Sequence, residues 1–204
     1  MSSSLSVTLS GRHVTLTPLT IDDVPALVEA ASGDRSTFGW SIVPDTTQGM
    51  EALIGRLLAE CDQLIAVPFT TRRSDTHEII GMTRFLTLRW FFEREYPDGV
   101  EIGGTFLTAS AQRTAANTEA KLLMMTHAFD VWGVRRLDLK TDERNVRSRR
   151  AIERIGGQFE GVLRNWQAAQ VEGEDGLTRN SAIYSILDSE WPGVREGLEA
   201  RLLN

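Results

Sequence analysis

The sequence has 204 residues, of which 41% are hydrophobic and 25% charged, and this fits one globular domain that can bury its own core. A formal net charge of −6 disfavours nucleic acid as a partner, because such binders need a broad basic face. One cysteine excludes an internal disulfide, and the three histidines are not spaced as metal ligands, so we expect no metal.

The N-terminal region contains no apolar run long enough to cross a bilayer, and residues 1–4 lack the basic start of a secretory signal. We therefore expect a cytoplasmic protein with no membrane partner. We also expect residues 1–6 to be a flexible N-terminus ahead of a single domain that spans residues 1–204.

The first half of the chain predicts a strand, two helices and two strands. Residues 12–17 alternate in the strand period, and a helix follows from Ile21 with Thr20 as its N-cap. A second helix has a buried stripe from Met50 to Cys61. Strands are expected over residues 63–70 and 78–90, which a polar turn separates.

The second half predicts a strand over residues 100–108 and a long amphipathic helix over 117–132, which Gly133 ends. The remaining elements are expected in the order strand 135–140, helix 145–155, strands 158–164 and 181–187, and helix 189–203. The order β-α-α-β-β-β-α-β-α-β-β indicates one mixed α/β domain and not a Rossmann array.

The turn from Gln112 to Asn117 connects a strand directly to the long helix. Free N–H groups and the helix dipole make such a helix start an anion site. We expect Ala115 to have a helical φ, because alanine is the best helix former. We expect Asn117 to cap the helix by accepting the N–H of Ala120. The alternative is a strand–helix turn with a capping asparagine and no ligand.

Glu101 is the candidate general base, on an inward position of the 100–108 strand. An attacking amine is mostly protonated at neutral pH and must lose a proton before it can attack a carbonyl. The alternative is a glutamate that faces solvent or pairs with an arginine. Gly103-Gly104, just after Glu101, indicates a bulge or a close backbone approach within the strand.

Three segments together resemble the GNAT superfamily of N-acyltransferases. Gln112–Asn117 reads Q-x-x-A-x-N where the family usually has Q/R-x-x-G-x-G/A, so both glycines are missing. Val100–Gly103 resembles the E-I-G segment of the RimJ/RimL-like branch, whose members acetylate protein N-termini and other amines. Asn145–Ser148 and Gly156–Phe159 resemble its N-x-x-S…G-F segment, with Gly157-Gln158 inserted before the aromatic residue.

The resemblance covers nearly the whole chain and implies a single GNAT-like α/β domain. Its central sheet is expected to be mixed but mostly antiparallel, with about seven strands and flanking helices. The fourth and fifth strands, at residues 100–108 and 135–140, are expected to splay apart. The pantetheine arm of a CoA thioester inserts there in the family.

The same resemblance implies acetyl-CoA as co-substrate. Leu107 is expected to hold the thioester oxygen through its backbone N–H, which is the usual oxyanion device. Asn145 is expected to bond the pantetheine arm, and Ser148 to return a proton to the departing sulfur; the alternatives are an N-cap alone and a residue with no chemical role. Tyr184 is an alternative acid. The implied cofactor-binding residues are Phe106, Leu107, Thr108, Gln112, Arg113, Thr114, Ala115, Ala116, Asn117, Thr118, Asn145 and Ser148.

We therefore expect an N-acyltransferase that moves an acetyl group from acetyl-CoA to a primary amine by direct attack in a ternary complex. A noncatalytic acyl-CoA-binding or interaction module is the alternative, because both motif glycines are absent. A third reading is an RNA contact through five arginines over residues 144–154, which also suit a solvated helix with pairs such as Glu143–Arg147.

The sequence is compatible with a homodimer. Several aromatic residues in or beside loops suit an acceptor pocket, a dimer face or core packing equally well. They are Trp40, Trp90, Phe91, Phe92 and Trp166.

Overall fold

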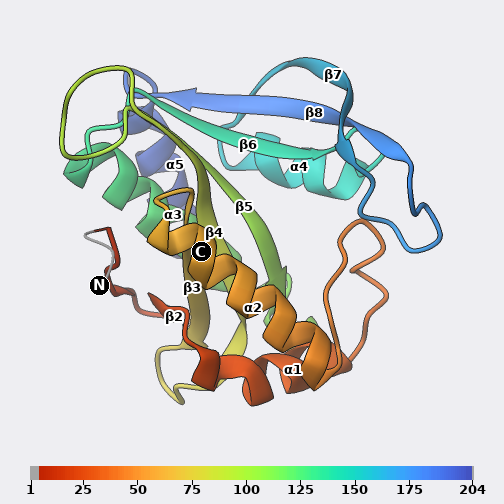
Figure 1. Cartoon of the computed structure of the whole chain (residues 1–204). Helices are drawn as coiled ribbons and strands as arrows, with labels where there is room; N and C mark the ends of the chain where they lie inside the picture. The colour runs from red at the N-terminus through yellow and green to blue at the C-terminus, as the bar shows by residue number, and fades with distance from the viewer. Residues whose placement is uncertain (1–4, 204) are drawn as a thin grey trace.

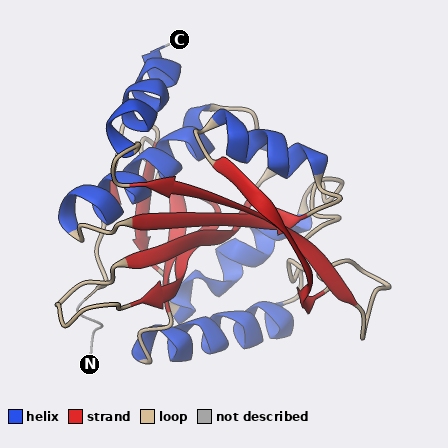
Figure 2. Ribbon diagram, turned by 90° about the horizontal axis from the view of Figure 1, so that it is seen from above, coloured by secondary structure: helices blue, strands red, loops and turns tan. Residues whose placement is uncertain are grey.

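The computed structural model describes residues 5–203, which form one sheet with helices on both faces (Figures 1 and 2). The strands are β1 Leu9–Ser10, β2 Val14–Pro18, β3 Ala66–Arg73, β4 Ile79–Arg89, β5 Gly99–Leu107, β6 Arg136–Asp142, β7 Gln158–Ala168 and β8 Thr178–Leu187. The α-helices are α1 Val24–Ser32, α2 Thr47–Asp62, α3 Ala115–Thr126, α4 Val146–Arg154 and α5 Trp191–Leu203. Two 3₁₀ turns, Ile21–Asp23 and Ala109–Ala111, and a π-helix, His127–Val131, complete the elements.

The expected single α/β domain is confirmed, with eight strands in place of about seven. The strand order is β1-β2-β3-β4-β5-β6-β8-β7. The additional strand, β1, has two residues and is too short to show a strand period in the sequence. Residues 1–4 of the segment expected to be flexible lie outside the described residues, whereas Leu5 is buried in the core.

β5 and β6 separate along most of their length, as expected of the fourth and fifth predicted strands. Their parallel pairing covers three positions, Gly99↔Arg136, Val100↔Leu137 and Glu101↔Asp138. β5 continues to Leu107 and β6 to Asp142 after the last of these pairs. The sheet therefore opens immediately beyond Glu101, and Figure 1 shows the two strands diverging there.

Each face of the sheet has its own hydrophobic cluster. On one face Val100 and Ile102 of β5 pack in a large core with residues of α3 and α5, including Met124 and Leu198. On the other face α1 and α2 cover part of β4 and β5 in a second cluster that includes Met82 and Phe106. Because side chains alternate along β5, Glu101 projects away from the α3 face.

The long helix differs in detail from its expected range of 117–132. α3 begins at Ala115, and the π-helix continues it to Val131, with Gly133 in the left-handed region at φ 64°. The expectation that Asn117 is the N-cap is wrong. Thr114 is the cap because its hydroxyl accepts the N–H of Ala116 at 3.2 Å, one turn earlier.

A buried carboxylate holds α3 against the start of the sheet. The Glu119 side chain accepts the backbone N–H groups of Arg12, His13 and Val14 at 2.9, 2.6 and 2.7 Å. Gly11 has no room for a side chain here, since an added Cβ would lie 2.5 Å from the Glu119 carboxyl carbon. The turn before β2 therefore fixes the position of α3. None of the helices within residues 5–203 is both long and apolar enough to span a membrane.

Candidate active site

The turn before α3 retains the conformation of an anion site without its glycines. Ala115 is the first residue of α3 and is not among the residues with positive φ, as the sequence predicts. The left-handed position is Arg113, with φ 59°. The Ala115 methyl group therefore carries no backbone strain. The N–H groups at a helix start have no carbonyl partner within the helix, and here the Thr114 hydroxyl accepts that of Ala116.

Gln112 connects three segments at this turn. Its amide nitrogen donates to Thr37 Oγ1 at 2.7 Å, in the loop between α1 and α2, and to the Leu107 carbonyl at 3.0 Å. Its amide oxygen accepts from Arg147 Nη2 of α4 at 2.7 Å. The beginnings of α3 and α4 are thus bridged across the opening between β5 and β6.

The start of α4 lies on the far side of this opening. Asn145 caps α4, and its Oδ1 accepts the backbone N–H of Ser148 at 3.0 Å. Ser148 is half-buried in the first turn. Two helix N-termini therefore flank the gap between the strands, and each supplies N–H groups that suit an anionic ligand.

The Gly103-Gly104 bulge is present. The β4–β5 register shifts between Met82↔Phe106 and Arg84↔Gly103, and Gly104 has φ 57°. Past the bulge, a Cβ added at Gly81 of β4 would lie 2.0 Å from the Phe106 carbonyl oxygen, so that oxygen points to β4. The N–H of Leu107 belongs to the same trans peptide and points the opposite way, toward β6. This is the direction that an oxyanion donor in the gap requires.

The other expected cofactor residues serve local packing in this structure. Phe106 is buried and meets Phe38 edge to face at 5.8 Å. Thr108 donates its N–H to the Ile80 carbonyl at 2.8 Å. Ala116 is buried, and Asn117 and Thr118 are half-buried in the first turn of α3.

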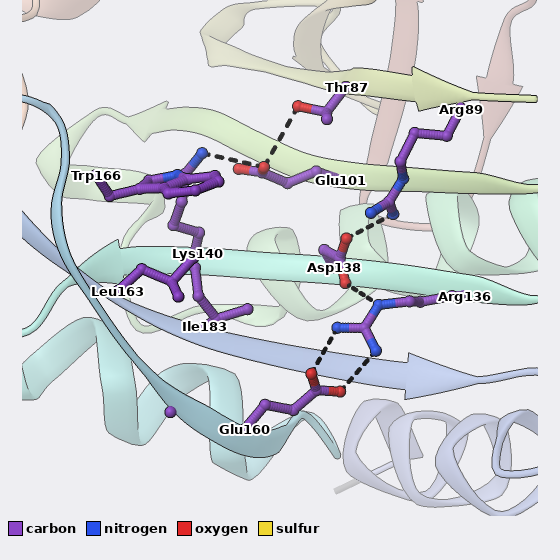
Figure 3. A pocket seen from close by; sticks show the side chains of 11 residues that line it. Thr87, Arg89, Glu101, Arg136, Asp138, Lys140, Glu160, Leu163, Trp166 and Ile183 are labelled. Atoms are coloured by element: carbon purple, nitrogen blue, oxygen red, sulfur yellow. Dashed lines mark hydrogen bonds and ion pairs between the residues drawn. The ribbon is translucent and has the colours of Figure 1, made fainter.

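Glu101 lies in a cavity of about 340 Å³ on the face of the sheet opposite α3 (Figure 3). The walls come from five strands, β4 to β8, on both sides of the opening. The lining residues are Thr87, Arg89, Glu101, Arg136, Asp138, Lys140, Glu160, Gly161, Leu163, Trp166 and Ile183. The carboxylate is thus next to a space of the size that small ligands use.

Burial raises the pKa of the Glu101 carboxyl group, and the ammonium of Lys140 opposes this rise. Lys140 Nζ lies 3.1 Å from Glu101 Oε2, and both side chains are largely buried. The alternative to a general base is a glutamate that faces solvent or pairs with an arginine. In the structure Glu101 does form an ion pair, but its partner is a lysine. A carboxylate with a raised pKa beside a cavity is typical of a proton acceptor.

Thr87 also contacts Glu101, from a strained position in β4. Its φ of 53° lies in the left-handed region, which is rare for a β-branched residue, and it stands in a second bulge between Leu86 and Arg89. The hydroxyl lies 3.5 Å from Glu101 Oε2. The bulge turns this side chain into the cavity beside the carboxylate.

The other four charged side chains of the cavity form a chain of ion pairs, which the dashed lines of Figure 3 mark. Arg89 pairs with Asp138 at 2.5 Å, Asp138 pairs with Arg136 at 2.6 Å, and Arg136 pairs with Glu160 at 2.7 Å. These groups therefore form a polar wall with its charges balanced.

Trp166 supplies an apolar wall. The β7–β8 register shifts between Leu163 and Gln167, and within this bulge Asn165 has φ 49° and donates its N–H to Asn180 Oδ1 at 2.9 Å. The bulge directs Trp166 and Leu163 to the cavity. Among the loop aromatics, Trp40 lies under the Arg144 guanidinium at 4.9 Å, and Trp90, Phe91 and Phe92 are exposed and do not line the cavity.

Tyr184 faces away from this cavity. It pairs with Leu139, a neighbour of Asp138 on β6, so it points to the opposite face of the sheet from Glu101. Its hydroxyl donates to Glu153 and accepts from Arg149, both on α4, at 3.0 Å. The alternative role of Tyr184 as an acid for a reaction at Glu101 is therefore not supported.

Three of the five arginines over residues 144–154, namely Arg144, Arg147 and Arg149, have individual polar partners. Arg144 pairs with Asp142 and Glu174 at 2.8 Å, and Arg147 bonds Gln112. The expected Glu143–Arg147 pair is not among the contacts of the described residues, because Glu143 accepts from Asn180. An arginine that reaches the turn before α3 is well placed for a phosphate group.

Sequence reasoning missed Lys140 and Lys121. Lys140 stands in the 135–140 strand, and its two-residue spacing from Asp138 is the signal that places both on one face. Lys121 is a buried residue of α3 whose amine faces the sheet, and burial lowers its pKa to about 7. Its Nζ donates to the hydroxyls of Thr105 and Thr83 at 2.9 and 3.4 Å.

The comparisons with known proteins agree with this geometry. The family model of the acetyltransferase (GNAT) domain matches residues 13–158. The chain therefore belongs to the GNAT acetyltransferase family and is an N-acetyltransferase. Comparison with curated proteins finds no match.

Solved structures show the same fold over nearly the whole chain. A GCN5-related N-acetyltransferase from Brucella melitensis is 27% identical, with a TM-score of 0.83, over 98% of this chain and 87% of that one. A protein from T. thermophilus that is assigned as an acetyltransferase is 32% identical, with a TM-score of 0.80, over 98% of both chains.

A third solved structure is Mycobacterium smegmatis RimJ in complex with CoA-disulfide. It is 19% identical, with a TM-score of 0.79, over 98% of this chain and 97% of that one. This likeness concerns the fold, and in fold the chain resembles the RimJ/RimL-like branch.

Proposed function

We propose that this protein transfers an acetyl group from acetyl-CoA to a primary amine, either a protein N-terminus or a small amine, by direct attack in a ternary complex. The observation that carries the proposal is the position of Glu101. Its buried carboxylate lies at the last paired position before β5 and β6 separate, beside a cavity on the face of the sheet opposite α3.

The CoA moiety would lie along the opening. The first turn of α3, from Thr114 to Thr118, offers N–H groups for the pyrophosphate, with Gln112 and Arg147 at its edge. Leu107 directs its N–H to the gap and would hold the thioester oxygen as negative charge develops on it. Asn145 and Ser148 would contact the arm near the sulfur from the other side.

The acceptor amine would enter from the cavity. The Glu101 carboxylate would take a proton from the ammonium, after which the neutral amine attacks the thioester carbonyl carbon. The carbon–sulfur bond breaks as the carbon–nitrogen bond forms, and the thiolate would take up a proton, for which Ser148 is the candidate donor. Direct transfer needs no covalent intermediate on the protein.

Glu101→Gln tests the proposal. Turnover should fall by about two orders of magnitude, the scale of a general base, while the affinity for CoA stays the same. Glu160→Gln is the matched control, since this carboxylate lines the same cavity but is held by Arg136. Turnover that is unchanged in Glu101→Gln would remove Glu101 from this role.

The absence of both motif glycines keeps a noncatalytic acyl-CoA-binding module as the competing function. Calorimetric titration with CoA and acetyl-CoA, followed by assay against a panel of peptides and polyamines, separates the two. Binding without transfer to any amine would favour the module, and no binding would contradict both. The helical Ala115 supports an intact pyrophosphate site.

A further inference from the structure

The chain contains very few amines of its own. Lys and Arg together number 22, and of these only Lys121 and Lys140 are lysines. Both are largely buried, Lys121 with 6% of its surface exposed and Lys140 with 15% of its side chain exposed. The cations on the surface of this protein are therefore arginines, which cannot accept an acetyl group at neutral pH.

The amine of Lys140 lies in the cavity next to the candidate base, where an acceptor amine would have to bind. It lies on β6 two residues beyond Asp138, so its side chain projects from the same face as Glu101 and from the part of β6 that has separated from β5. Nζ donates to Glu101 Oε2 at 3.1 Å, and Figure 3 shows the two side chains meeting in the cavity.

We infer that Lys140 is an internal acetyl acceptor. When acetyl-CoA is bound and no external amine fills the cavity, the acetyl group passes to Lys140 Nζ. This inference rests on the proposed acetyl transfer and on Glu101 as the base. It adds a modification site at the centre of the same cavity.

The step balances in atoms and protons. The Lys140 ammonium gives one proton to the Glu101 carboxylate, and the freed lone pair attacks the carbonyl carbon of the thioester. The carbon–sulfur bond breaks, the carbon–nitrogen bond of the amide forms, and the second proton lost by the nitrogen goes to the CoA thiolate. The proton on Glu101 then returns to solvent.

Lys121 is a natural internal comparison. It lies on the α3 face of the sheet, where its amine contacts the hydroxyls of Thr83 and Thr105. Burial lowers its pKa to about 7, so a large share of this amine is neutral at neutral pH. If the neutral fraction of the amine alone decided the site, Lys121 would be acetylated. If contact with Glu101 and access from the gap between β5 and β6 decide it, Lys140 is acetylated.

Acetylation would also regulate the enzyme. An acetylated Lys140 has no positive charge, so the buried Glu101 carboxylate loses the nearest group that stabilises its ionised form. The other charged groups that line the cavity are Arg89, Asp138, Arg136 and Glu160, and these are paired with one another. The modified enzyme should therefore be less active at neutral pH.

The test is incubation of the purified protein with isotopically labelled acetyl-CoA and no acceptor, followed by peptide mass spectrometry. One acetyl group is expected on Lys140, at a rate independent of protein concentration, with Lys121 unmodified. Glu101→Gln should suppress this label about a hundredfold, the scale of a general base. Lys121→Arg should keep the label on Lys140, and Lys140→Arg should lose it.

The outcomes separate this inference from the proposed function. An external amine that is acetylated while Lys140 stays unmodified overturns the inference and leaves the function intact. A label on Lys121, or a rate that rises with protein concentration, also overturns it. Protection of Lys140 by an accepted amine supports it. If CoA binds but no external amine is acetylated and Lys140 carries no label, both the inference and the proposed function are contradicted.

Discussion

Lys140 and Glu101 form a buried ion pair, 3.1 Å from Nζ to Oε2, across the point where β5 and β6 separate. The pairing of the strands ends at Glu101 and Asp138, so the side chain of Lys140 reaches back to the last joined position. The candidate base is thus held by a residue of the opposite strand.

Lys140→Met should shift the pH dependence of kcat/KM. A base works only when it is ionised, so activity is lost as the pH falls through its pKa. Burial raises the pKa of Glu101 and Lys140 lowers it, and removal of the cation should move this acidic limb to higher pH. Lys140→Arg keeps the charge and should leave the limb closer to that of the wild type. A limb that stays in place in Lys140→Met would contradict the coupling.

Thr114→Ala should destabilise the protein by about 1 kcal/mol, the usual value of an N-cap, and weaken CoA binding as the first turn of α3 frays. Asn117→Ala is the matched control, because Asn117 lies inside the helix and does not cap it. Urea unfolding measures the first effect and calorimetry the second. Equal losses of stability in the two variants would argue against Thr114 as the cap.

Gln112→Ala should raise the KM for acetyl-CoA, since the side chain bridges Leu107, Thr37 and Arg147 at the opening. Arg147→Ala breaks one of these contacts, and the double variant should cost less than the sum of the single variants. Additive effects on binding would mean that the Gln112–Arg147 contact does not contribute to the CoA site.

Trp166→Ala should raise the KM for the acceptor with little effect on the affinity for CoA, because the ring lines the cavity next to Glu101 and Lys140. Trp90→Ala, at an exposed tryptophan outside the cavity, should change neither. Kinetics with one substrate varied at a time distinguish the two effects. A raised acetyl-CoA KM alone would contradict the placement of the acceptor.

Lys121→Met should stabilise the protein at neutral pH by roughly 1–3 kcal/mol, because desolvation of the buried amine costs more than its hydrogen bonds to Thr105 and Thr83 return. The folded-state pKa of Lys121 is about 7, below its ordinary 10.5, so between these values the unfolded chain binds more protons. Stability of the wild type should therefore rise with pH across this window. Unfolding experiments at several pH values should show a smaller rise in the variant.

Local chemistry explains why much of the site could be predicted from the sequence. A double glycine within a strand predicts a bulge, and the Gly103-Gly104 bulge is present. An alanine at a helix start predicts a helical φ at Ala115, and this too is observed. The cap was misplaced because Thr114 and Asn117 are both good capping residues one turn apart, and local propensity does not separate them.

Long-range register explains what could not be predicted. The contact of Lys140 with Glu101 depends on the parallel pairing of β5 and β6, which places residues 39 positions apart in sequence beside each other. Trp166 reaches the cavity only because β7 bulges opposite Asn180, and Thr87 only because β4 holds it at a left-handed φ. Neither conformation has a local sequence signal.

The three backbone N–H groups that donate to Glu119 fix the position of α3, and with it the proposed CoA site. The segment at the start of β2 therefore supports a site that is far from it in sequence. Removal of residues up to and including Val14 would leave the buried Glu119 carboxylate without these three donors, and α3 would lose its attachment to the sheet. Loss of cofactor affinity after N-terminal trimming would then report a displaced helix, and fusion partners for this enzyme belong at its other end.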